Sequence, residues 1–153
     1  KLEKKRFAYF FNDKLTGLYN EDYLKIILNN RDVNQYKCLH LLHLRNVPEY
    51  NRREGWEKGD LLLKEFAVEL QAALPNALLF RAYGNEFAAI ALEHLAIERT
   101  DLNGFACLRD TGIEVGVQHY DLTAGMIYTI DKQDRLDIQA LASPPAAKPP
   151  VPA

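Results

Sequence analysis

The amino-acid sequence predicts an α+β fold: a central, mostly antiparallel sheet flanked by helices. One observation is the segment 78–92, in which two apolar arms surround Gly84 and Asn85, the residue types that a two-residue hairpin turn requires. Because both arms are apolar at nearly every position, we expect this hairpin in the middle of a covered sheet. The other is the expected order of elements, strand, helix, helix, strand, strand, helix, strand, which is typical of α+β proteins.

Length and composition indicate one globular domain. A chain of 153 residues with 48% hydrophobic residues can bury a sizeable core. A net charge of −2 gives no reason to expect nucleic acid or direct contact with an anionic membrane. Cys38 and Cys107 stand in apolar settings and are expected to be free thiols. With no apolar run of about 18 residues, the segment is expected to be cytoplasmic, and a parent protein could still be membrane-anchored.

The first third of the chain predicts two helices and a strand. Residues 1–11 are basic and then aromatic, and are expected to end a helix that continues upstream, as either a packing helix or a signalling stalk. Asn20 is a suitable N-cap for a helix over 21–29. In the strand expected over 38–44, His40 and His43 fall on opposite faces, which argues against a shared metal site.

The remaining elements follow from periodicity and from proline and glycine. Pro48 predicts the first turn of a short helix ending near Gly55, against which Trp56 is expected to pack. The clearest amphipathic helix covers 59–73. Beyond the hairpin we expect a partly helical connection over 96–109, strands over 113–117 and 122–130, a short helix over 135–142, and an extended linker over 143–153, which holds five of the seven prolines.

Four motifs together resemble one family. They are Asp13-x-Leu15-Thr16-Gly17-Leu18-Tyr19-Asn20, the spaced set of Asn51, Gly55 and Gly59-Asp60, the hairpin Arg81-Ala82-Tyr83-Gly84-Asn85-Glu86-Phe87, and Thr123-Ala124-Gly125-Met126. In this order they resemble the GGDEF domains of diguanylate cyclases. The resemblance implies a fold related to the palm of nucleotide cyclases and polymerases. It divides the chain into the end of an upstream signalling helix (1–12), a degenerate GGDEF domain (13–142) and a Pro-rich tail (143–153).

The family's chemistry joins two GTP molecules into cyclic di-GMP with the help of carboxylate-bound Mg²⁺. At the positions of the metal-holding acids this chain has His43 and Asn85, and Arg45 replaces the second acid after the first strand. Mg²⁺ prefers anionic oxygen ligands, so we expect no Mg²⁺ of the family kind, no cofactor and no catalytic residues. Tyr83 replaces the first signature glycine and would crowd phosphates, and Val47-Pro48 replaces a phosphate-facing lysine segment.

Other family positions are kept. Asn51 and Asp60 match the guanine-contacting pair, and Glu86 matches the fourth signature letter, a candidate base or metal contact. Each also has a structural alternative: Asp60 with its preceding glycine as a helix cap, Asn51 as the end of a helix, and Glu86 as the partner of Arg81 or Arg45.

The family's product-inhibition motif is replaced. Its Arg and Asp correspond to Leu74 and Ala77, neither of which can bind a phosphate, so we expect no inhibitory site. The late helix of the family is replaced by Ala140-Leu141 and the tail, where Pro144 and Pro145 break the helix that would aim Lys148.

These positions predict a catalytically inactive regulatory or interaction module of a cyclic di-GMP signalling protein. The alternatives are a GTP-binding allosteric sensor controlling a fused phosphodiesterase of the EAL type, and a residual diguanylate cyclase. The expected partners are other domains of the parent chain, namely an upstream sensor and a downstream EAL domain, and a second copy in a homodimer.

Overall fold

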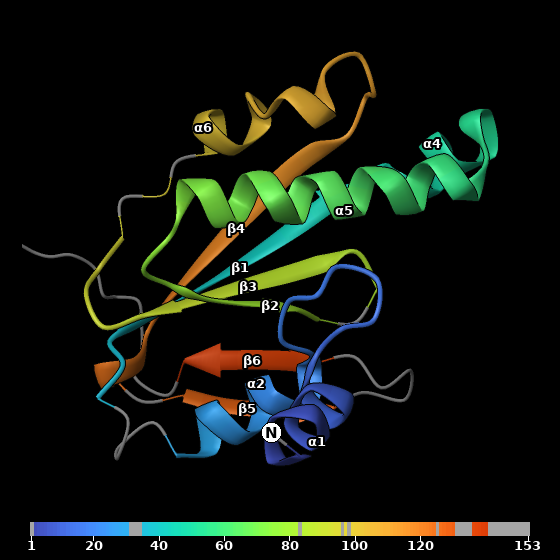
Figure 1. The fold of residues 1–153 in the computed structure, drawn as a ribbon. Helices are drawn as coiled ribbons and strands as arrows, with labels where there is room; N and C mark the ends of the chain where they lie inside the picture. Colours follow the sequence, from blue (N-terminus) through green and yellow to red (C-terminus); the bar gives the residue numbers. More distant parts are fainter. Residues whose placement is uncertain are drawn as a thin grey trace, which may run out of the picture.

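The structure is a computed structural model that describes residues 2–30, 35–82, 84–95, 97, 99–124, 126–130 and 136–140 (Figure 1). Its elements are, in chain order, α1 (Leu2–Phe11), α2 (Glu21–Asn29), β1 (Cys38–Arg45), α4 (Val47–Glu54), α5 (Trp56–Ala73), β2 (Leu78–Arg81), β3 (Glu86–Ala91), α6 (Arg99–Asn103), the 3₁₀ helix η1 (Ala106–Leu108), β4 (Glu114–Asp121), the 3₁₀ helix η2 (Leu122–Ala124), β5 (Met126–Ile130) and β6 (Leu136–Ala140).

The central sheet has four strands in the order β2-β3-β1-β4, and each neighbouring pair is antiparallel. β5 and β6 form a separate two-stranded sheet. Helix α5 lies over one face of the central sheet and α2 over the other (Figure 1). The predicted α+β fold with a mostly antiparallel sheet flanked by helices is therefore confirmed. Among the described residues, no helix is long and apolar enough to cross a membrane.

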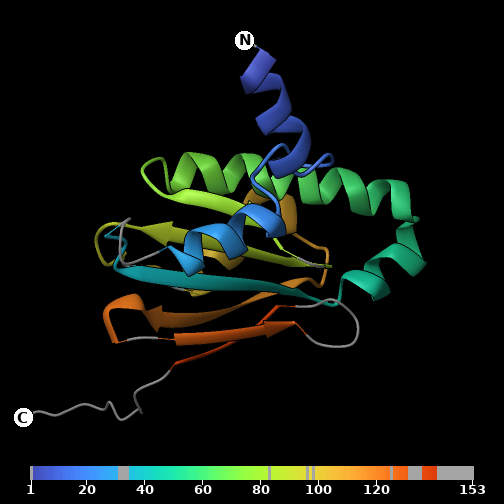
Figure 2. The ribbon, with the colours of Figure 1, turned by 90° about the horizontal axis from the view of Figure 1, so that it is seen from below.

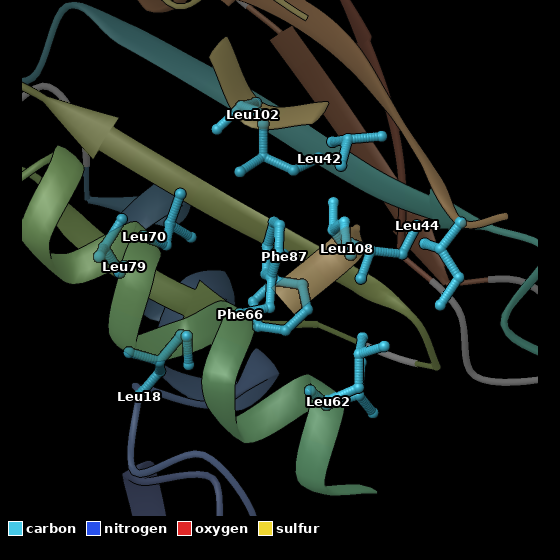
Figure 3. Close-up of a cluster of buried hydrophobic side chains, with 14 of the residues drawn as sticks. Leu18, Leu42, Leu44, Leu62, Phe66, Leu70, Leu79, Phe87, Leu102 and Leu108 are labelled. Carbon is cyan, nitrogen blue, oxygen red and sulfur yellow. The ribbon is translucent and has the colours of Figure 1, made fainter. Parts of the chain in front are cut away.

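Two hydrophobic clusters hold these layers together because side chains alternate between the faces of a strand. On the α5 face, Phe66 of α5 packs against Phe87 of β3 with ring centroids 4.9 Å apart (Figure 3). On the other face, Leu39 of β1 packs with α2 and with Phe80 of β2. Each of these side chains is buried, so both faces of the sheet are covered near its centre.

The N-terminal elements follow the sequence closely. α2 begins where predicted, and the Asn20 side chain caps it by accepting a hydrogen bond from the Tyr23 backbone N–H at 3.0 Å. α1 leads away from the rest of the domain (Figure 2). Its inner end is attached through aromatic contacts, since Phe7 and Phe11 lie 5.0 and 5.4 Å from the ring of Tyr23.

The hairpin differs from the prediction in two ways. Four residues, 82–85, separate β2 from β3 in place of a two-residue turn, and of the described ones Gly84 alone has a positive φ (68°). β3 is an interior strand as expected, but β2 is the edge of the sheet. Tyr19 covers that edge, because its N–H donates to the Leu79 carbonyl and its carbonyl accepts from the Arg81 N–H.

Several other predictions about elements are wrong. α5 begins at Trp56, three residues earlier than expected, because Gly55 adopts φ 96° and makes the corner after α4. Trp56 does not pack there, since it is 68% exposed. The later strands also have different bounds: β4 extends to Asp121, η2 occupies the start of the expected 122–130 strand, and β6 stands where a short helix was expected. The expected linker over 143–153 lies outside the described residues. Of the pair Ala140-Leu141, Ala140 is the last residue of β6 and Leu141 lies outside the described residues.

Candidate functional site

The sheet brings together the four positions that correspond to the family's metal site. His43 near the end of β1 is paired in register with Glu86 at the start of β3. The Leu44 N–H donates to the Asn85 carbonyl at 3.0 Å, which fixes the hairpin tip beside the strand end. His43 Nδ1 lies 3.5 Å from Glu86 Oε2, so the imidazole contacts the carboxylate directly. The sequence left Arg81 and Arg45 as partners for Glu86 and did not anticipate His43.

Arg45 adds a positive charge to this face. Its Nη2 lies 2.8 Å from the position that a Cβ on Gly116 would occupy, so the guanidinium rests over a residue that has no side chain. Gly116 is directly opposite His43 in the β1–β4 register. The Arg45 side chain therefore folds back towards the rung that carries His43 and Glu86.

Arg81 ties the hairpin to the opening motif. Its Nη1 lies 3.4 Å from Asp13 Oδ1 and its Nη2 donates to the Gly84 carbonyl at 3.1 Å. Asp13 Oδ2 accepts from both the N–H and the hydroxyl of Thr16, which closes the loop before α2. Two segments 68 residues apart are joined in this way. The contact gives Asp13 and Arg81 a structural role in this chain.

These donors do not fit Mg²⁺ of the family kind. Mg²⁺ requires near-octahedral oxygen coordination, usually with more than one carboxylate or phosphate. Glu86 supplies the one carboxylate at the four positions, beside a nitrogen ligand (His43), a neutral amide (Asn85) and a cation (Arg45). Within the part of the chain that the structure describes, no three His, Cys, Asp or Glu side chains converge to hold a metal ion.

The residues expected to contact guanine meet at the corner between α4 and α5. The Asn51 side chain lies against Gly59, whose Cα approaches so closely that an added Cβ would fall 1.8 Å from Asn51 Oδ1. Asn51 Oδ1 is buried and has no hydrogen-bond partner among the described residues. Asp60 follows Gly59 and is partly exposed. The helix-cap alternative for Asp60 is wrong, because Asp60 lies inside α5, and Asn51 does not end α4, which continues to Glu54.

The positions of the inhibitory motif are apolar and partly buried. Leu74 and Ala77 line a cavity of about 480 Å³ together with Leu18, Tyr19 and Pro75. The absence of an inhibitory site stays a prediction. Tyr83, which was expected to crowd phosphates, lies outside the described ranges, and so does Lys148.

A histidine pair that sequence reasoning missed lies on the opposite face of β1. His40 is 3% exposed, whereas the His43 side chain is 52% exposed, so the predicted opposite facing is confirmed. His40 Nδ1 meets Nδ1 of His119, its register partner on β4, at 2.5 Å. Burial, with His119 and His94 nearby, lowers the pKa of His40 to about 4. No local signal predicts the pair, because its members are 79 residues apart.

The architecture is that of an α+β domain with helices on both faces of an antiparallel sheet, and comparison with known proteins identifies the family. The profile described as "Diguanylate cyclase, GGDEF domain" matches residues 10–123. The chain therefore belongs to the GGDEF domain family. None of the curated proteins matches it significantly.

Solved structures share the fold. The coiled coil and GGDEF domain of DgcB from Caulobacter crescentus, in complex with c-di-GMP, matches with a TM-score of 0.60 and 22% identity over 77% of this chain and 72% of that one. The S helix-GGDEF-EAL portion of LapD from Vibrio cholerae, bound to c-di-GMP, gives 0.55 and 21% over 76% and 30%. A diguanylate cyclase/phosphodiesterase from Caldicellulosiruptor saccharolyticus gives 0.52 and 26% over 67% and 61%.

Proposed function

We propose that this chain is a catalytically inactive GGDEF domain that serves as a regulatory or interaction module in a cyclic di-GMP signalling protein. One observation carries the proposal: the rung where the family holds its metal ions contains a His43–Glu86 contact at 3.5 Å with the Arg45 guanidinium folded towards it. A set of carboxylates is replaced by one carboxylate beside the His43 imidazole, with the Arg45 guanidinium over Gly116 on the other side of His43.

The replaced charges strongly weaken the attraction of this rung for a divalent metal ion. Two unit charges 4 Å apart interact by about 4 kcal/mol at an effective dielectric of about 20. Removing two acids and adding Arg45 therefore takes away the attraction for a divalent ion and adds repulsion. Phosphoryl transfer depends on such ions to neutralise charge on the phosphates and to align the attacking and leaving oxygens. The proposal follows from this chemistry of the donor set.

The direct test is synthesis. The purified protein is incubated with GTP and either Mg²⁺ or Mn²⁺, and cyclic di-GMP and pyrophosphate are measured by chromatography. We expect neither product. A time-dependent appearance of both, in the ratio of one cyclic di-GMP to two pyrophosphates, would overturn the proposal in favour of a residual cyclase. The double variant His43→Asp/Asn85→Asp is the matched comparison, and it should bind Mn²⁺ more tightly than the wild type, as followed by electron paramagnetic resonance.

A regulatory role requires other domains to act on, and the relatives suggest which. The similar structures carry a coiled coil in DgcB, and an S helix and an EAL domain in LapD. We infer that the parent chain places an input helix before α1 and an output domain, such as an EAL phosphodiesterase, after the described residues. The cytoplasmic location and the homodimer remain parts of this proposal.

A second candidate is a GTP-binding sensor, favoured by the Asn51–Gly59 contact. A buried amide oxygen without a partner is costly, and a glycine inside a helix costs about 1 kcal/mol relative to alanine. Both occur at one point of the α4–α5 corner, beside Asp60. Calorimetric titration with GTP tests the idea, with Asp60→Ala as the control. No heat at millimolar nucleotide would eliminate it.

A further inference from the structure

The indole of Trp56 stands exposed beside the Asn51–Asp60 corner. Trp56 is the first residue of α5 and is 68% exposed, although a side chain of this size normally buries most of its surface. It is the chain's single tryptophan. The fold does not use it for packing, since it belongs to neither hydrophobic cluster of the described residues.

Helical spacing places Trp56 on the same side of α5 as the polar groups of the corner. Residues three and four apart are neighbours on a helix surface, with Cβ atoms roughly 5–6 Å apart, and Gly59 and Asp60 follow Trp56 at these two spacings. Gly59 faces α4, because the Asn51 side chain lies against it. The three residues and Asn51 therefore form one patch, which we call the α5 corner.

The α5 corner offers a flat aromatic surface next to hydrogen-bonding groups. Asp60 carries a carboxylate that accepts from two donors at once. Asn51 Oδ1 lies buried against Gly59 beneath this surface and is unpaired among the described residues, so Asp60 supplies the exposed acceptor. Rotation of the Asn51 amide group exchanges the positions of its oxygen and its nitrogen. A ligand that matches this patch needs a planar ring with two neighbouring N–H donors on its edge. Guanine has this edge, whereas adenine presents an acceptor where guanine has its ring N–H.

We propose that Trp56 stacks on the guanine base of a bound guanine nucleotide while Asp60 accepts from the N–H groups on the base edge. This assigns to Trp56 the role of a positioning residue, with the preference for guanine coming from Asp60, and it rests on the nucleotide-binding candidate function above. Stacking of one base on an aromatic side chain contributes enough that its removal weakens binding roughly 5- to 150-fold. The base can come from GTP or from cyclic di-GMP, which share the guanine edge.

The single tryptophan makes the test direct. Fluorescence of the wild-type protein, excited at the red edge of indole absorption, is followed during titration with GTP, cyclic di-GMP and ATP. We expect saturable quenching by at least one guanine nucleotide, weaker or no quenching by ATP, and loss of the effect in Asp60→Ala. The two guanine arms identify the source of the base.

Calorimetry separates this inference from the function on which it rests. The affinity of the quenching nucleotide should fall roughly 5- to 150-fold in Trp56→Ala, and remain unchanged in Leu61→Ala. Leu61 is a suitable control because it is also exposed on α5 (53%) but lies roughly 140° around the helix from Trp56. Equal affinity in wild type and Trp56→Ala would overturn the role of Trp56 alone. No heat with either guanine nucleotide in the wild type would overturn nucleotide binding as well.

Discussion

Because Asn51 lies against Gly59, the substitution Gly59→Ala should destabilise the wild-type protein but stabilise a variant in which Asn51 is replaced by alanine. An added Cβ would lie 1.8 Å from Asn51 Oδ1 and 2.8 Å from Asn51 Cγ, well inside van der Waals contact. The Asn51 side chain must therefore rotate away, or α4 must shift. The three atoms nearest to the added Cβ all belong to Asn51, so the shortest contacts are made with this residue.

Two opposing terms decide the outcome. Alanine inside a helix is favoured over glycine by about 1 kcal/mol. Overpacking of a buried position costs about 1–3 kcal/mol. We expect Gly59→Ala to destabilise the wild type by about 1 kcal/mol. In an Asn51→Ala background the steric term disappears, and the same substitution should stabilise the protein by about 1 kcal/mol. The coupling in a double-mutant cycle is therefore about 2 kcal/mol.

Urea denaturation followed by circular dichroism measures the four free energies of unfolding, with the m-value checked for constancy. Val68→Ala is the matched control, because Val68 lies on α5 and is 64% exposed, and its effect should be the same with either residue at position 51. If Gly59→Ala stabilises the wild type and the Asn51→Ala variant equally, Asn51 does not rest on Gly59, and the reasoning about the α5 corner fails.

Three further predictions concern other contacts. His40 has a folded-state pKa of about 4, below its ordinary value of 6.5, so as the pH falls the unfolded chain binds the extra proton first. The contribution of His40 to stability is therefore complete above about pH 6.5 and falls as the pH drops towards 4, by at most about 3 kcal/mol. Denaturation at several pH values measures this slope, which should be lost in His40→Phe. Asp13→Ala removes the ion pair with Arg81 and should lower the free energy of unfolding by about 2 kcal/mol; an unchanged urea midpoint would contradict this. Burial, with the Glu69 carboxylate beside it, raises the pKa of the Cys107 thiol to about 12. Alkylation by iodoacetamide at pH 8, measured by peptide mass spectrometry, should therefore be about a thousandfold slower in the folded than in the unfolded protein. Comparable rates would refute the burial of the thiol.

Local signals predicted the N-terminal elements well. Asn20 and the acidic residues after it specify the start of α2, and the structure places the cap hydrogen bond there. The period of apolar residues located α5, but its first turn was missed. Gly55 ends α4 as expected, and its positive φ also lets the chain turn at once into α5.

Longer-range effects explain the errors. Residues 136–140 contain helix-forming types, yet they form β6 because they pair with β5 in a regular antiparallel register; such pairing overrides a weak local preference. The hairpin's position was misjudged because its apolar arms do not reveal that Tyr19, 60 residues before Leu79, covers the outer edge of β2. Contacts of this kind depend on topology, which single-sequence patterns do not encode.

The candidate site likewise has features that residue identity predicts and features that depend on the strand registers. Replacement of the metal-holding acids could be predicted from the sequence, since it needs only the identity of His43, Arg45 and Asn85. The contact between His43 and Glu86 and the fold-back of Arg45 over Gly116 could not, because they depend on the registers of β1 with β3 and β4. The registers show that the substituted positions lie beside one another on the sheet.

The two parts of the site also differ in what they contribute to the fold, and this difference bears on function. On the β1–β3 rung the side chains satisfy one another, as His43 and Glu86 do, so that rung is explained by structure alone. At the α5 corner, a buried Asn51 oxygen that is unpaired among the described residues lies against a glycine within a helix, and both features are unfavourable for stability. The exposed indole of Trp56 lies one turn of α5 before that glycine. Local choices that oppose stability tend to gather where a protein binds something. The corner is therefore the place to look for a ligand, even though the rung is unsuited to catalysis.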